Sequence, residues 1–317
     1  MKNHTFNMLM GVAVGDALGV PFEFQSRLER DFEPATDMVG FGAHHQPAGT
    51  WSDDSSLTFC LSEAIIEGYS LENTAKWLTS WLYQKTWTAR NDVFDIGITT
   101  RESLQLLKSK IDKGLSDEFK HLKYRANHMD NGNGSLMRIL PLLFVIKSKP
   151  IEEQFEIVWD NSALTHRHVR AAMCCMIYLK IAEYLCEGEN KIKAYHKTQK
   201  EIKALWKAID FNLEEQRLFE KVIDNDISKY TKNEIRSGGY VMESLECALW
   251  CFLNTDSFKD AVLSAVNMGS DTDTNAAITG GLAGLYYGVE SIPMDWLDKL
   301  ARKEDIEDLA KRLNEKQ

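Results

Sequence analysis

Apolar side chains recur at helical spacing along most of the chain. Between Asp54 and Gly68, apolar residues follow one another three or four positions apart, and Gly68 ends the pattern. Ser70 can cap a following segment that carries a similar apolar stripe. Sustained alternation of apolar and polar residues, which marks half-buried strands, is nearly absent, and only six prolines interrupt the chain. The pattern therefore predicts an all-α protein with about a dozen or more helices.

One domain is expected to span residues 1–317, because no linker divides the chain. The polar regions 110–131 and 187–237 keep helical character, so we expect peripheral helices or insertions there. Asp256 is a suitable N-cap for a helix that begins at Ser257. Helices are predicted at about 55–68, 96–109, 136–147, 151–163, 167–187, 198–210, 214–225, 240–254, 257–268, 275–288, 293–302 and 304–314.

The composition bounds the class of partner. A chain of 317 residues with 44% hydrophobic residues can bury a large core, and its formal net charge is −10. A chain this acidic repels phosphate backbones, so nucleic acid is not expected as a partner. The densest basic stretch, Lys191 to Lys207, is interleaved with Glu201 and apolar residues, as on a solvated helix.

The N-terminal region and the cysteines indicate a cytoplasmic protein. Met8 to Val14 is a short apolar run, but a single Lys precedes it and Asp16 follows it closely, so we interpret it as part of a mature N-terminus. No apolar run reaches the ~18 residues that a membrane span needs, so no membrane is expected. The six cysteines have neither a secreted framework nor zinc spacing and are expected to be buried thiols in a reducing compartment.

Two acidic clusters each lie directly before a predicted helix. They are Ser52-Asp53-Asp54 and Asp271-Thr272-Asp273-Thr274. Asp, Ser and Thr are common helix caps, so two unrelated sets of caps are one interpretation. Capping accounts for one or two residues per helix, however, and clustered carboxylates repel one another unless a cation compensates them. Oxygen ligands select hard ions, so the clusters predict a shared site for two divalent cations, Mg²⁺ or Mn²⁺, with Ca²⁺ as an alternative.

Three further motifs could line the same site as the two acidic clusters. Glu23 lies between two aromatic residues; if buried, it would have a raised pKa and could transfer protons, and otherwise it is a solvent-facing side chain. The segment Asn131-Gly132-Asn133-Gly134-Ser135 suits phosphate binding through backbone N–H groups, or an ordinary tight turn. His166 could contact a ligand or lie at a helix start.

Together these segments resemble the ADP-ribosylglycohydrolase family, of the type that includes dinitrogenase reductase-activating glycohydrolase. The matches run in order along most of the chain, and their order makes the resemblance specific. They are Gly15-Asp16-Ala17-Leu18-Gly19 through Glu23, Gly49 to Asp54, Asp95 to Arg101, Asn131 to Arg138, Ala163 to His166, Ser237 to Trp250, Asp271 to Thr274 and Gly280 to Gly284.

The resemblance implies an all-α fold with a two-metal centre at the floor of an ADP-ribose cleft. It assigns Glu23 and Asp95 as candidate acid/base residues, the 131–135 loop as a diphosphate contact and His166 as a ligand contact. The implied reaction is hydrolysis of the bond at ribose C1″ of ADP-ribose on a modified protein, most commonly on arginine. The protein is expected to be a monomer. By the same resemblance, the metal ligands are Ser52, Asp53, Asp54, Asp271, Asp273 and Thr274.

Two departures and two alternatives accompany the resemblance. Ser52 stands where the family more often has Thr, which keeps a hydroxyl ligand with a less restrained χ1. Ser270 stands where a Gly is usual, so it is expected either to crowd the loop or to add a hydrogen bond.

One alternative function is hydrolysis of another ADP-ribose linkage, as in serine-linked ADP-ribose, O-acetyl-ADP-ribose or a modified nucleobase. The other is a non-catalytic ADP-ribose-binding protein, which would be expected to lose acidic ligands that are retained here.

Overall fold

The computed structural model describes residues 3–127 and 129–316, and the regular structure within these ranges is helical. Two isolated β-bridges, Phe41 with Gln46 and Gly132 with Tyr240, occur in this part of the chain. The all-α prediction is confirmed. The helices are α1 His4–Gly19, α2 Arg27–Phe32, α3 Asp53–Ile66, α4 Leu71–Gln84, α5 Ile98–Asp112, α6 Leu143–Ile146, α7 Ile151–Ser162, α8 Val169–Cys186, α9 Lys191–Ala208, α10 Leu213–Leu218, α11 Val241–Leu253, α12 Phe258–Val266, α13 Thr272–Tyr287, α14 Met294–Lys299 and α15 Lys303–Asn314.

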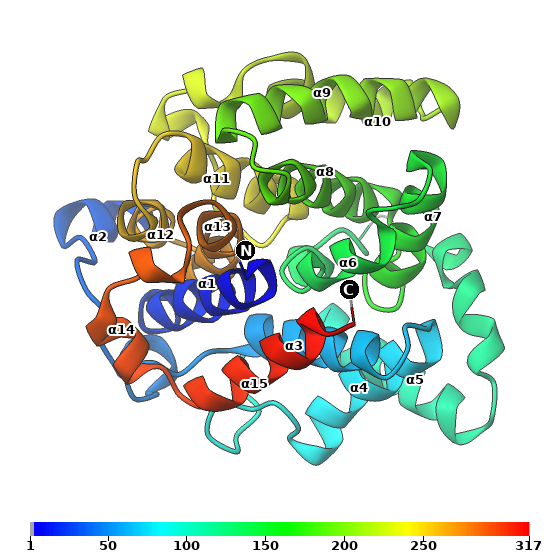
Figure 1. The fold of residues 1–317 in the computed structure, drawn as a ribbon, viewed down its shortest axis with the longest axis horizontal. Helices are drawn as coiled ribbons and strands as arrows, with labels where there is room; N and C mark the ends of the chain where they lie inside the picture. The colour runs from blue at the N-terminus through cyan, green and yellow to red at the C-terminus, as the bar shows by residue number, and fades with distance from the viewer. Residues whose placement is uncertain (1–2, 128, 317) are drawn as a thin grey trace.

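Helices α1 and α13, from opposite ends of the chain, pack together at the centre of the molecule (Figure 1). Glycines allow this contact: a Cβ on Gly11 would lie 2.2 Å from the carbonyl oxygen of Gly280, and a Cβ on Gly15 would lie 2.1 Å from that of Ala276. Helices α11 and α12 cover α13, while α3 and α15 pack against α1. One contiguous apolar core runs from Met8 to Leu313, so the described chain forms a single domain.

Helix α1 was not predicted as a helix, because it is apolar on all sides and shows no amphipathic period. The prediction that no segment is long and apolar enough to cross a membrane is also corrected. Residues His4–Phe22 meet that test by length and composition, with a mean hydropathy of 1.3, and 89% of the window is buried inside the protein. This apolar surface is therefore already used in the core.

Other predicted helices differ from the observed ones for local reasons. Over 136–147 the chain forms a 3₁₀ turn, Leu140–Leu142, before the short α6, because Pro141 has no N–H to donate to a longer helix. Over 214–225, α10 ends at Leu218 and a π-helical turn, Glu220–Asp224, follows. This wider turn places Val222 and Ile223 in the core.

Two helix starts are also corrected. The cap of α12 is Ser257 rather than Asp256, because the Ser257 Oγ accepts a hydrogen bond of 3.0 Å from the Asp260 N–H. Helix α9 begins at Lys191, before the predicted 198, because the Asn190 side chain caps it. In Figure 1, α9 and α10 lie along one edge of the molecule.

Candidate metal centre and ligand cleft

The first acidic cluster forms the start of α3. Ser52 is the N-cap: its Oγ accepts from the Asp54 N–H at 3.3 Å and donates to Asp54 Oδ2 at 2.9 Å. Asp53 and Asp54 occupy the first turn, where the helix dipole favours negative charge. Ser52 therefore caps α3, so helix capping is one role of this cluster.

Asp16 of α1, which was not predicted as a site residue, holds this turn in place. Its carboxylate accepts hydrogen bonds from the Ser52 N–H at 2.8 Å and from the Ser55 N–H and Oγ–H at 2.9 and 2.6 Å. The side chain is fully buried, and burial raises its pKa to about 6. A carboxylate within an otherwise apolar helix was the signal in the sequence that could have identified it.

The second cluster begins α13 and meets the first. Asp271 is the N-cap residue, and its carboxylate accepts a hydrogen bond of 2.6 Å from the Asn133 side chain. The Thr274 hydroxyl lies 3.4 Å from Asp54 Oδ2, across a sequence separation of 220 residues. Since α3 and α13 both pack against α1, the clusters at the starts of α3 and α13 are brought together.

Several carboxylate oxygens at this point have no partner within the described protein. Asp54 Oδ1 and both carboxylate oxygens of Asp273 are buried without a hydrogen bond. Ligand atoms of Asp16, Asp54 and Asp273 all lie within 4.8 Å of one another. Burial, followed by neighbouring carboxylates, raises the pKa of Asp53, Asp54 and Asp273 well above the ordinary range. Such a cluster fits hard divalent cations, and capping alone does not account for it.

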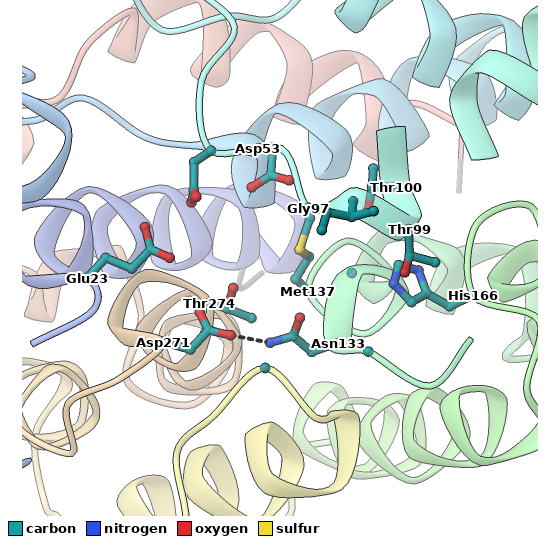
Figure 2. A pocket seen from close by; sticks show the side chains of 15 residues that line it. Glu23, Asp53, Gly97, Thr99, Thr100, Asn133, Met137, His166, Asp271 and Thr274 are labelled. Carbon is teal, nitrogen blue, oxygen red and sulfur yellow. Dashed lines mark hydrogen bonds between the residues drawn. The ribbon is translucent and has the colours of Figure 1, made fainter. Parts of the chain in front are cut away.

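A cleft of about 290 Å³ opens beside these carboxylates, and Figure 2 shows the side chains that line it. Asp53, Asp271 and Thr274 line this cleft, whereas Ser52, Asp54 and Asp273 do not. The lining residues are Glu23, Asp53, Asp95, Gly97, Ile98, Thr99, Thr100, Gly132, Asn133, Gly134, Met137, His166, Gly239, Asp271 and Thr274. The cleft therefore brings together some members of each predicted group of site residues.

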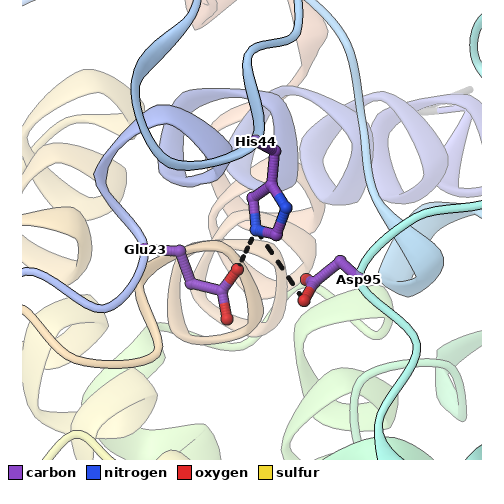
Figure 3. A group of neighbouring side chains, drawn as sticks. All are labelled: Glu23, His44 and Asp95. Carbon is purple, nitrogen blue, oxygen red and sulfur yellow. Dashed lines mark hydrogen bonds and ion pairs between the residues drawn. The ribbon is translucent and has the colours of Figure 1, made fainter.

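The predicted acid/base residues Glu23 and Asp95 lie together at the cleft, with His44 between them (Figure 3). His44 Nε2 contacts Glu23 Oε2 and lies 3.8 Å from Asp95 Oδ1. Burial raises the pKa of Glu23 to about 7, and the hydrogen bond to Glu23 raises the pKa of His44. Glu23 is therefore not the solvent-facing side chain of the alternative interpretation. His44 was missed because no spacing in the sequence links it to Glu23.

The 131–135 loop lies at the cleft only in part. Gly132, Asn133 and Gly134 line it, whereas Asn131 and Ser135 do not. The Asn131 carbonyl accepts from the Val241 N–H, and the buried Ser135 hydroxyl accepts from Ser162 Oγ at 2.8 Å. The ligand-contact prediction thus has geometric support for the middle of the loop alone.

His166 lines the cleft from behind the loop, and α8 begins only at Val169. A Cβ at Gly134 would lie 2.6 Å from the His166 ring, so Gly134 is required for the close approach. Burial lowers the pKa of His166 to about 3, which keeps the imidazole neutral.

The N-terminus of α5 adds residues that were not predicted as site residues. Gly97, its N-cap, and the first three helical residues line the cleft, and no side chain caps this end. N–H groups of a first helical turn have no intrahelical acceptor, so they suit an anionic ligand group. The resemblance included this segment, but the sequence alone did not show that the helix would point at the cleft.

Ser270, the second departure from the family pattern, has a left-handed backbone with φ of 68°. Its N–H donates to the Gln25 carbonyl at 2.7 Å, and its carbonyl accepts from the Phe24 N–H at 2.8 Å. The strained residue therefore ties the segment after Glu23 to the loop before Asp271. Glycine, which the resemblance leads one to expect at this position, would adopt this φ without strain.

The fold and the site define a class of protein: an all-helical enzyme in which acidic clusters from both ends of the chain meet beside a polar cleft. The family model described as ADP-ribosylglycohydrolase matches residues 2–317, so the chain belongs to this family.

Individual relatives agree with this assignment. The chain is 33% identical to "ADP-ribosylarginine hydrolase Tri1" of Serratia proteamaculans, covering 96% of this chain and 77% of that protein. It is 26% identical to "ADP-ribosyl-[dinitrogen reductase] glycohydrolase" of Rhodospirillum rubrum, covering 97% and 93%. A solved structure titled "ADP-ribosylglycohydrolase-related protein complex" superposes with a TM-score of 0.79 at 25% identity, covering 99% and 97% of the two chains.

Proposed function

We propose that this protein hydrolyses the bond between ADP-ribose and an arginine side chain of a modified protein, and so reverses mono-ADP-ribosylation. The observation that carries the proposal is the set of buried, unpartnered carboxylate oxygens of Asp54 and Asp273 beside the cleft. Two relatives at 30% identity or more carry the name ADP-ribosylarginine hydrolase, which favours arginine over other linkages.

The metal centre is proposed to hold two divalent cations, Mg²⁺ or Mn²⁺. When bound, such cations supply Lewis-acid chemistry that activates water near neutral pH and orients the ribose hydroxyls. The proposed ligands are those of the two clusters, Ser52, Asp53, Asp54, Asp271, Asp273 and Thr274. Asp16 is proposed as the residue that positions the first cluster, because its carboxylate is already occupied by three hydrogen bonds.

Glu23 and Asp95 are proposed to handle the protons of the reaction. Water adds to C1″ while the bond from C1″ to the guanidine nitrogen breaks, so one proton leaves the water and one reaches the leaving nitrogen. Both carboxyl groups lie at the cleft, and His44 Nε2 lies between them.

The diphosphate is proposed to bind at Gly132, Asn133 and Gly134, with His166 and the start of α5 nearby. The loop offers glycine backbone, and α5 offers free N–H groups at the same cleft. In this proposal the anionic part of the ligand lies next to hydrogen-bond donors of the loop and of α5.

A turnover assay tests the proposal directly. Arginine-ADP-ribosylated protein is incubated with the enzyme and Mg²⁺, Mn²⁺ or chelator, and released ADP-ribose is measured. Metal-dependent release is expected, with little release from a serine-linked substrate. Release from the serine-linked substrate alone would overturn the arginine assignment, and binding of ADP-ribose without turnover in either metal would overturn catalysis.

A further inference from the structure

Arg138 is a fully buried guanidinium behind the cleft wall, and none of the ion pairs among the described residues includes it. It donates instead to neutral acceptors: Nη1 to Asn161 Oδ1 at 2.9 Å, and Nη2 to the Asn161 carbonyl at 3.1 Å and to Thr165 Oγ1 at 3.0 Å. Burial lowers the pKa of Arg138 to about 10, so it remains charged at neutral pH. A buried cation that lacks a carboxylate is costly and calls for a reason.

The Thr165 hydroxyl connects this cation to His166. A guanidinium only donates, so Thr165 Oγ1 must accept from Arg138. The hydroxyl hydrogen is then directed to the other neighbour, His166 Nδ1, which lies 3.0 Å away. If Nδ1 carried the hydrogen instead, the Thr165 hydroxyl, only 1% exposed, would lose this acceptor and leave its own hydrogen unsatisfied in the interior.

We infer that Arg138 and Thr165 are positioning residues that hold His166 as a neutral imidazole with its hydrogen on Nε2, where it donates to an anionic oxygen of the ligand. The oxygen fits a phosphate group, and its assignment to the diphosphate of ADP-ribose rests on the proposed function. Figure 2 shows the His166 ring at the cleft.

Packing and electrostatics support this assignment independently. A Cβ added to Gly132 would lie 3.3 Å from His166 Nε2, and one added to Gly134 would lie 3.2 Å from it. The loop backbone therefore packs closely against the ring and holds it in place. The lowered pKa of His166 agrees with an imidazole that accepts at Nδ1 and does not become an imidazolium. The Arg138 charge behind the ring also favours an anion on the cleft side, while the chain of hydrogen bonds keeps the guanidinium itself out of the cleft.

The experiment combines histidine ¹⁵N NMR with ADP-ribose affinity. The full chain is compared with Thr165→Val, which removes the hydroxyl at similar volume, and with Thr165→Ser, which restores it. Thr79→Val is the matched control, since Thr79 is a buried threonine of α4 that bonds only the preceding helical turn. In the native protein the Nδ1 resonance of His166 is expected to be that of an unprotonated nitrogen.

Thr165→Val is expected to lose this tautomer preference and to weaken ADP-ribose binding ~10-fold, equal to about 1.4 kcal/mol. In Thr165→Val, KM is expected to rise more than kcat falls. Thr165→Ser should restore the native KM and kcat, and Thr79→Val should change neither KM nor kcat. A protonated Nδ1 of His166 in the native protein would overturn the inference, and this measurement does not depend on whether Thr165→Val folds. An unchanged tautomer in a folded Thr165→Val would overturn it as well. If the native tautomer is as inferred but ADP-ribose neither binds nor forms, the proposed function fails. The positioning of His166 by Arg138 and Thr165 is then still supported.

Discussion

At the scale of single residues, the site is governed by carboxylates that are buried beyond what the protein itself can compensate. Asp273 has no hydrogen bond to either oxygen, and Asp54 lacks one to Oδ1. Asp16, by contrast, is equally buried but receives three hydrogen bonds from the Ser52–Ser55 turn. The difference separates a carboxylate that organises the fold from the carboxylates that we propose as cation ligands.

Replacing Asp273 with Asn is expected to raise the metal-free stability and to abolish function. The neutral amide removes a charge whose pKa burial raises well above its usual range, so the Tm in chelator should rise. Activity should fall ~100-fold or more, and the rise in Tm given to the native protein by Mn²⁺ should disappear. Scanning calorimetry with and without Mn²⁺ measures both effects. Asp298→Asn, on the surface of α14, is the control and should change neither; full activity in Asp273→Asn would remove this residue from the metal site.

Ser270 gives a second prediction at this scale, because its left-handed backbone pairs with Phe24 and Gln25. A β-branched residue tolerates this conformation poorly, so Ser270→Val should lower the free energy of unfolding by about 1–2 kcal/mol. Ser270→Gly should retain or slightly increase it. Urea denaturation measures the difference, and kcat is expected to fall in the Val variant as Glu23 shifts. Equal stability of the Val and Gly variants would show that the strain at this position is not energetically important.

At the scale of elements, the sequence predicted most of the longer helices but missed the central helix α1. Helices such as α4, with one apolar stripe, show the period that prediction requires. Helices α1 and α13 are buried on nearly all sides, so α1 gave no period, and α13 was placed from 275 although it starts at Thr272. Pro141 and the π-helical turn after α10 broke two other predicted helices locally.

The α1–α13 contact sets the position of both acidic clusters, and its glycines should be intolerant of a single methyl group. In an isolated helix, Gly→Ala stabilises by roughly 1 kcal/mol. Here a Cβ on Gly280 would lie 2.2 Å from the Gly11 carbonyl oxygen, so Gly280→Ala should destabilise by about 3 kcal/mol. Thermal unfolding measures this change. Gly97→Ala, where the nearest atom would be 4.0 Å away, is the control for stability and should show little loss; a stable Gly280→Ala would mean that the two helices can separate without cost.

At the scale of the whole molecule, the sequence could indicate that two acidic clusters share a site, but not every residue that the fold brings to it. The two clusters were identifiable because four carboxylates at two helix starts exceed what capping needs. Asp16 and His44 were not, because their roles depend on contacts with Ser55 and Glu23 that only the tertiary structure creates. Ser135 was assigned to the cleft by its loop, yet its side chain turns to the core and bonds Ser162.

The same convergence of charge predicts how the stability of the whole protein depends on pH and metal. Burial raises the pKa of Glu23 to about 7 and that of Asp16 to about 6, from ordinary values of 4.5 and 3.8. A carboxyl group with a raised folded pKa stabilises the fold when protonated, and this contribution is lost as pH rises through the folded pKa. In chelator, the Tm should therefore rise as pH falls from 8 to 6.

Saturating Mn²⁺ should flatten or reverse this slope, because the cation binds the ionised carboxylates and competes with protons for them. The pH range of this prediction ends near pH 6 because His166, whose pKa is lowered, acts in the opposite direction. As pH falls further, His166 becomes protonated in the unfolded chain but stays neutral in the fold, so the folded protein loses stability. Calorimetry at fixed ionic strength measures both slopes, and Glu23→Gln, which removes one of the titrating groups, should reduce the metal-free slope. A metal-free protein that is more stable at pH 8 than at pH 6 would show that the protein alone compensates these charges, and the electrostatic case for the cations would fail.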